Sequence, residues 1–190
     1  LARGKELRRR MVAMVRFSLA PHRARLDSAD MDPVVTPLPG TATSLSSVPD
    51  PVLATGTIGA GVAVIPDAGV EVVQVVAPVS GVARRVAPHM FVIQTQRAEG
   101  DDGSDGQPSV FMQLGVDTGR LNGQGFDLHI QEGDIVRQGT PICTYTPREL
   151  GRMGFDPIVM VVGLQMRASE IKVDVIPGEP VMGGDNLFWV

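Results

Sequence analysis

Side chains able to carry chemistry are few in this chain and widely spaced. There are three histidines, His22, His89 and His129, and a single cysteine, Cys143. Nucleophilic catalysis needs a Ser, Cys or Thr with a base within reach, and no G-x-S-x-G or comparable context is present. Metal sites need clustered ligands, and the sequence has neither H-E-x-x-H nor C-x-x-C. General motifs therefore indicate no enzyme class, no metal site and no cofactor.

One apolar stretch ends where a nucleophile would be better placed than the residue present. SVFMQLGVDTGRL, residues 109–121, has a short apolar run, then Gln113, then a turn that contains Asp117 and Thr118. Asp117 and Thr118 are expected to build this turn, where a carboxylate can satisfy backbone N–H groups. His129 is expected to be an ordinary strand-surface or core residue.

The elements that must hold these residues are strands. Of the 190 residues, 43% are hydrophobic and 4% aromatic, with 22 glycines and 15 prolines, a mixture that favours short strands joined by tight turns. Strands are predicted at 62–66, 70–79, 82–87, 90–95, 109–115, 126–130, 141–146, 156–164 and 171–177. Many short strands at regular spacing indicate an all-β sandwich or barrel.

Three further segments refine this picture. The acidic, glycine-rich segment 97–108 is expected to be an exposed hairpin tip. Residues 147–154 are the best candidate for a short helix, with Pro147 at its start and Gly154 at its end. A Gly-bounded turn that leads through a V-x-x-G step into an apolar strand recurs within 132–145 and 177–190, as it does in small barrels.

Charge divides the chain into a basic segment and an acidic body. Residues 1–25 carry eight Lys or Arg and one acid, so with a net charge of −4 overall the rest of the chain carries −11. An acidic body repels phosphates and argues against nucleic-acid binding. Residues 1–31 are expected to be a disordered tail or translated upstream sequence, a basic amphipathic helix in peripheral contact with anionic lipid, or a transit-like peptide. Residues 32–190, which lack a membrane-length apolar run, are expected to form one soluble cytoplasmic domain.

Several stretches, taken in order, resemble one protein family. VTPLPGTATSLSSVPDPVLATGTIGAGVAVIP matches its opening, and VVAPVSGVARRVAPHMFVI is similar to its V-x-A-P-V-x-G strand pair and following histidine. FMQLGVDTGRLNGQGF matches its signature block, normally H-[LVF]-G-[IL]-D-T-V-x-L-x-G-E-G-F. The family is the glucose-type enzyme IIA domain of the bacterial phosphoenolpyruvate-dependent sugar phosphotransferase system, and the compact P-H form resembles its actinobacterial members. The resemblance covers residues 32–190. It implies an antiparallel β-sandwich or barrel of the glucose-permease IIA type, duplicated-hybrid-motif-like, with one short helix.

The same resemblance implies a site and partners. In the family, the first residue of the signature block is a histidine that takes a phosphoryl group from the phosphocarrier protein HPr and passes it to the IIB domain of a sugar permease. A second histidine lies beside it. The resemblance assigns the second histidine to His89 and the acceptor position to Gln113. HPr and a IIB or IIBC permease, met in trans, are the implied partners, with no cofactor.

Gln113 changes the expected chemistry. A glutamine amide delocalises its nitrogen lone pair into the carbonyl, whereas neutral imidazole offers a lone pair that can attack phosphorus. The chain is therefore predicted to be phosphotransfer-incompetent at this site. Three explanations stay open: a natural pseudo-carrier with a regulatory, partner-binding role, an active phosphocarrier with an introduced His-to-Gln substitution, or a drifted β-barrel binding module outside the phosphotransferase system.

A docking surface also follows from the resemblance. Leu53, Ile58, Phe91 and Met112 are expected to form an apolar rim for HPr, with Leu53 standing where the family usually has Phe. His89 either supports the site or is a half-buried residue of the strand end, and Asp117 and Thr118 are secondary candidates for orienting residue 113.

Overall fold

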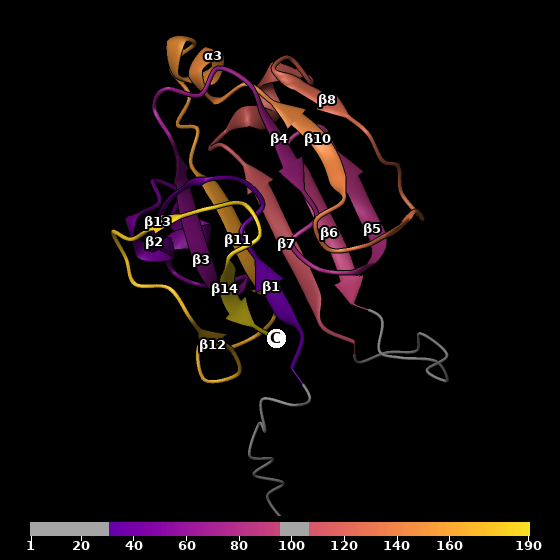
Figure 1. Ribbon diagram of the computed structural model, residues 1–190. Coiled ribbons are helices and arrows are strands. Elements are labelled where there is room, and N and C mark those ends of the chain that lie inside the picture. The colour runs from indigo at the N-terminus through magenta and orange to yellow at the C-terminus, as the bar shows by residue number, and fades with distance from the viewer. Residues whose placement is uncertain (1–30, 96–106) are drawn as a thin grey trace, which may run out of the picture.

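The computed structural model describes residues 31–95 and 107–190, which fold as three antiparallel β-sheets (Figure 1). The basic segment 1–31, apart from Met31, and most of the expected hairpin tip at 97–108 lie outside the described residues. The expected all-β, antiparallel fold is confirmed.

The largest sheet has eight strands in the order β13-β2-β3-β11-β7-β6-β5-β9. Their bounds are β13 Pro180–Val181, β2 Gly40–Ser44, β3 Gly59–Pro66, β11 Val159–Leu164, β7 Ser109–Leu114, β6 Met90–Thr95, β5 Gly81–Ala87 and β9 Ile135–Val136. Two three-stranded sheets complete the fold, in the orders β1-β14-β12 and β4-β10-β8. Their strands are β1 Pro33–Val35, β14 Asn186–Trp189, β12 Lys172–Val173, β4 Val73–Val76, β10 Pro141–Tyr145 and β8 Phe126–Leu128.

The order of the strands is the same when read from either edge of the large sheet. Each half supplies a two-residue edge strand, a strand that leads out of a small sheet, and a longer strand next to the central pair β7–β11. Equivalent hydrogen bonds close the two halves: Gly178 N donates to Ala42 O and Gly133 N donates to Ala83 O, each at 2.8 Å. Gly133 and Gly178 are the turn glycines of the recurring pattern, with φ of 93° and 96°, a backbone conformation that favours glycine. The repeat read in the sequence therefore marks two similar halves.

Short helices occupy the connections. They are η2 Leu45–Ser47, α2 Pro51–Ala54, η3 Thr118–Leu121 and α3 Pro147–Arg152. α3 confirms the helix expected at 147–154, since Pro147 occupies its first turn and Gly154 beyond its end has a φ of 87°. α2 was not expected. Its N-cap is Asp50, whose carboxylate accepts hydrogen bonds from the backbone N–H groups of Val52 and Leu53.

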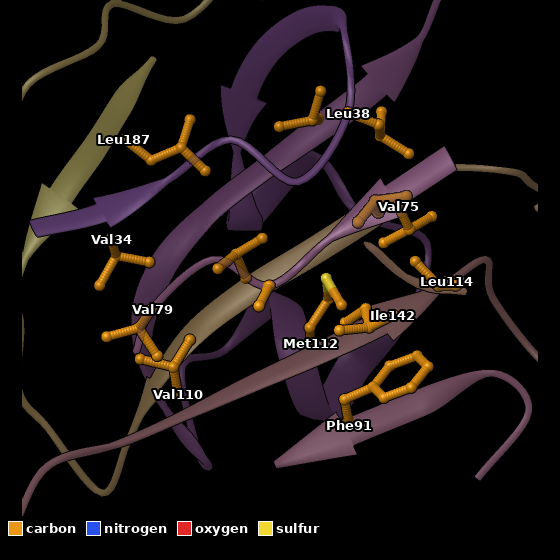
Figure 2. Packing of buried hydrophobic residues seen from close by; sticks show 14 of the residues in the cluster. Val34, Leu38, Val75, Val79, Phe91, Val110, Met112, Leu114, Ile142 and Leu187 are labelled. Atoms are coloured by element: carbon orange, nitrogen blue, oxygen red, sulfur yellow. The ribbon is translucent and has the colours of Figure 1, made fainter. Parts of the chain in front are cut away.

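Two hydrophobic clusters lie on opposite faces of the large sheet. The main core takes one face of the large sheet and side chains of both small sheets, including Val34, Val75, Ile142 and Leu187 (Figure 2). The second cluster lies on the other face, where Leu45 and Leu53 from the helical connections cover Met160 and Val162 of β11. Residue 113 belongs to a strand with both of these clusters as neighbours.

Candidate functional site

Gln113 lies near the end of β7, in the middle of the large sheet. It pairs with Met90 of β6 on one side and with Met160 of β11 on the other. Its neighbours Met112 and Leu114 point into the main core, and because side chains alternate along a strand, Gln113 points to the other face. The side chain is half-buried there.

The turn after β7 fixes the amide of Gln113. Gln113 Nε2 donates a hydrogen bond to the carbonyl oxygen of Gly115 at 3.0 Å. Gly115 has a φ of 78°, and a Cβ at this position would lie 2.5 Å from Thr118 Cγ2, so no larger residue fits. The buried hydroxyl of Thr118 donates to Leu114 O at 2.7 Å, so Thr118 builds the turn as predicted.

Asp117 contributes differently from the prediction. It has a φ of 59°, and its carboxylate makes no capping hydrogen bond to the backbone of η3. Instead the exposed side chain lies 3.8 Å from Arg120, Oδ2 to Nη2. The expected satisfaction of backbone N–H groups by this carboxylate is therefore wrong, because the left-handed backbone at Asp117 turns the side chain outward to solvent.

His89 reaches the same place from the turn between β5 and β6. Leu114 N donates to His89 O at 2.8 Å, which fixes this turn against the end of β7. Burial lowers the pKa of His89 below its ordinary value, so the neutral ring is favoured near neutral pH. Among the described residues, no hydrogen bond joins the His89 ring to Gln113. The structure thus brings Gln113, His89 and Thr118 together at one end of β7.

Gly119 borders the histidine where the signature block has valine. A Cβ added at Gly119 would lie 3.3 Å from both Cε1 and Nε2 of His89. That separation is tighter than ordinary van der Waals contact, so a valine here would press on the ring. The glycine leaves one side of the His89 ring uncovered by a side chain from η3.

The predicted apolar rim is wrong at three of its four positions. Phe91 and Met112 are each 1% exposed and pack in the main core, as Figure 2 shows, while Leu53 is 3% exposed in the second cluster. Only Ile58 is half-buried. Phe91 and Met112 face each other across the β6–β7 pair, so both side chains point away from the face that carries Gln113.

Sequence reasoning missed the residues that do flank Gln113. Met90 is its direct partner on β6, and Val92, two residues further along the same face, pairs with Phe111. Met90 and Val92 are half-buried, and Phe111 is 8% exposed. We call Gln113, Met90, Val92 and Phe111 the site face. Counting in steps of two from Gln113 and across to its strand partner would have found it.

The remaining candidates lie outside the site. His129 Nε2 is 2.8 Å from Thr144 Oγ1 on the exposed side of a small sheet, which agrees with a strand-surface role. Cys143 is buried, and burial raises its pKa to about 12, so the thiol stays protonated. Within residues 31–95 and 107–190, no three His, Cys, Asp or Glu side chains gather as metal ligands would. The same residues contain no helix long and apolar enough to cross a membrane.

The fold and the site define a protein of the glucose-permease IIA type, built as two similar halves with a polar residue and a histidine at the end of a central strand. A family model for the phosphoenolpyruvate-dependent sugar phosphotransferase system, EIIA 1, matches residues 32–169. The chain belongs to this family, whose role is phosphoryl transfer to a sugar permease.

Similar proteins agree with the assignment. The chain is 31% identical over 153 residues to the glucose-specific EIIA component of Oceanobacillus iheyensis, covering 77% of this chain and 85% of that protein. It is 33% identical over 127 residues to the beta-glucoside-specific EIIBCA component of Bacillus subtilis, covering 67% of this chain and 19% of that protein. The glucosamine-specific EIICBA component of Bacillus subtilis is 29% identical over 138 residues, covering 73% of this chain and 20% of that protein. The chain thus spans about a fifth of these two longer relatives.

A solved structure shares the fold. Glucose permease IIA from Mycoplasma capricolum superimposes with a TM-score of 0.66, at 22% identity, and the match covers 83% of this chain and 94% of that chain. The expected family and fold type are confirmed.

Proposed function

We propose that this chain binds partners of the sugar phosphotransferase system without carrying a phosphoryl group at residue 113. The observation that supports the proposal is the amide of Gln113, which occupies the position assigned by resemblance to the phospho-acceptor histidine and donates its N–H to Gly115 O at 3.0 Å. Transfer would need a nitrogen lone pair to form a bond to phosphorus while the bond from phosphorus to the donor histidine breaks. An amide nitrogen has no such lone pair.

Several finer points belong to the same proposal. The partners are HPr and the IIB part of a sugar permease, met in trans, and the chain acts in the cytoplasm where these proteins expose their docking surfaces. His89 supports the site without carrying phosphate. The basic segment 1–31 makes peripheral contact with the inner face of the membrane, since its charge of +7 over residues 1–25 suits anionic lipid.

A phosphorylation assay tests the proposal. The full chain is incubated with phosphoenolpyruvate, enzyme I and HPr, and acid-labile phosphate on the chain is measured. We expect none on the unaltered chain. The matched control is Gln113→His, which should gain up to one acid-labile phosphate per chain if the rest of the site is competent.

Two results would contradict the proposal. Stoichiometric acid-labile phosphate on the unaltered chain would show that another residue, with His89 the first candidate, accepts phosphate. Failure of the chain to bind either HPr or a permease IIB domain would favour the drifted binding module. Sequencing the genomic codon for residue 113 decides the third explanation, because a histidine codon would indicate an ordinary working phosphocarrier.

A further inference from the structure

Gln113 offers an approaching partner only one kind of hydrogen-bonding group. Its Nε2 donates to Gly115 O at 3.0 Å, and because a carbonyl oxygen can only accept, the NH₂ end of the amide must be the end turned to the backbone. Within the described residues, Gln113 Oε1 accepts no hydrogen bond, and it is not one of the buried oxygens without a partner. Oε1 therefore faces solvent as a hydrogen-bond acceptor.

The turn after β7 opposes rotation of this amide. Thr118 Oγ1 donates to Leu114 O at 2.7 Å and lies 3.4 Å from Gly115 O, so both carbonyls are held in place. Turning the Gln113 amide over would break its bond to Gly115 and bring two acceptor oxygens together. An intact neutral hydrogen bond contributes about 1 kcal/mol, and the repulsion adds to that cost.

The charged groups beside Gln113 do not reverse this acceptor character. Asp117 and Arg120 form an exposed pair 3.8 Å apart, so together they add no net positive charge. His89 is half-buried, and its lowered pKa favours the neutral ring. The site face therefore presents an acceptor oxygen within an apolar surround of Met90 and Val92.

We propose that this site face binds the dephosphorylated form of the histidine phosphocarrier HPr in preference to the phosphorylated form. An unmodified imidazole always carries at least one N–H, which Gln113 Oε1 can accept. A phosphoryl group at neutral pH presents charged oxygens that are acceptors only, so it meets Gln113 Oε1 without a proton between them. This inference rests on the proposed function, because it requires docking without transfer.

Such a preference would make the chain a reader of phosphoryl supply. Dephosphorylated carrier accumulates when sugar uptake consumes phosphoryl groups faster than they are replaced. A chain that binds this form and passes nothing on would be occupied during uptake and free when uptake stops.

Calorimetry with the full chain tests the preference. The probe is HPr, either dephosphorylated or kept phosphorylated by enzyme I and excess phosphoenolpyruvate. We expect dephosphorylated HPr to bind about tenfold more tightly, as expected for a hydrogen bond gained in one state and an unpaired charged group in the other. Gln113→Met keeps the length of the side chain and removes the amide, so this variant should lose most of the preference.

A matched control separates the amide from the general charge of the chain. Gln94→Met changes a glutamine on the same face of β6, where Gln94 Oε1 accepts from Arg84 Nε at 2.7 Å, and should leave the preference unchanged. If both forms of HPr bind the unaltered chain equally, or if Gln113→Met keeps the full preference, the inference is wrong while the proposed function stands. Acid-labile phosphate on the chain, or no binding of either form, would overturn both.

Discussion

At the scale of single residues, the histidine beside Gln113 should titrate below its ordinary range. Burial lowers the pKa of His89 from 6.5, and it is the only cause of the shift, since no acid or base pairs with the ring. The unfolded chain binds this proton more readily, so His89 reduces the stability of the fold as the pH falls through about 6.5. We expect an NMR titration of the His89 ring to have its midpoint below 6.5.

A substitution at Gly119 sharpens this prediction. Gly119→Ala would add a methyl group 3.3 Å from two ring atoms of His89, which buries the ring further and should lower its pKa more. Gly151→Ala in α3 is the control, because a Cβ there meets nothing within 4 Å. A midpoint at or above 6.5, or an upward shift in Gly119→Ala, would contradict the prediction.

At the scale of elements, the alternation along β6 separates stability from binding. Phe91 is 1% exposed in the main core, and its neighbour Met90 lies half-buried on the site face. We expect Phe91→Ala to cost about 3–5 kcal/mol in urea unfolding, because it leaves a cavity. Met90→Ala should cost about 1 kcal/mol or less and weaken HPr binding about fivefold.

The binding half of this comparison needs variants that remain folded. Phe91→Leu leaves a smaller cavity than Phe91→Ala and should bind HPr as the unaltered chain does. If Phe91→Leu weakened binding as much as Met90→Ala, or if Met90→Ala left binding unchanged, the assignment of the site face would be wrong.

The same elements show what the sequence could reveal. Long, Val-rich stretches predicted β3, β5, β6, β7, β10 and β11 to within a few residues, because apolar runs bounded by Gly or Pro have no other stable use. β1, β2, β9 and β13 were not predicted. Three of these four have three residues or fewer, and β2 is Gly40–Ser44, a run of small and hydroxyl residues whose strand conformation comes from pairing with β3.

The site was predictable only where family motifs reached it. Gln113, His89 and Thr118 do converge, although they come from the end of one strand and from two turns. The rim failed because apolar residues were chosen by type, and type does not tell which face of a strand a side chain occupies. Phe91 and Met112 have the more apolar appearance, and for that reason they are in the core.

At the scale of the whole molecule, the two similar halves do not have separate cores. The eight-stranded sheet runs through both halves, and the central β7–β11 pair joins them. The main core includes Val34 and Leu187 from one small sheet and Val75 and Ile142 from the other. Since neither half can bury its apolar face alone, the described domain should unfold as one cooperative unit.

The chain offers an optical probe in each half. Its only tryptophan, Trp189, lies in β14, where Nε1 donates to Asp174 and Lys172 Nζ is 5.7 Å from the ring centroid. Its only tyrosine, Tyr145, lies in β10, fully buried, stacked on Phe126 at 5.6 Å and donating its hydroxyl to Pro157 O. We expect Trp189 fluorescence and the near-UV circular dichroism of Tyr145 to give the same urea midpoint.

A substitution at the centre of the sheet extends this test. Val161 of β11 is fully buried in the main core and pairs with Met112 across the junction of the halves. Val161→Ala should lower both midpoints equally, by about 1–3 kcal/mol in the free energy of unfolding, because it weakens a core that the halves share. Different midpoints for the two probes in the unaltered chain, or a Val161→Ala shift confined to one probe, would show that the halves unfold separately.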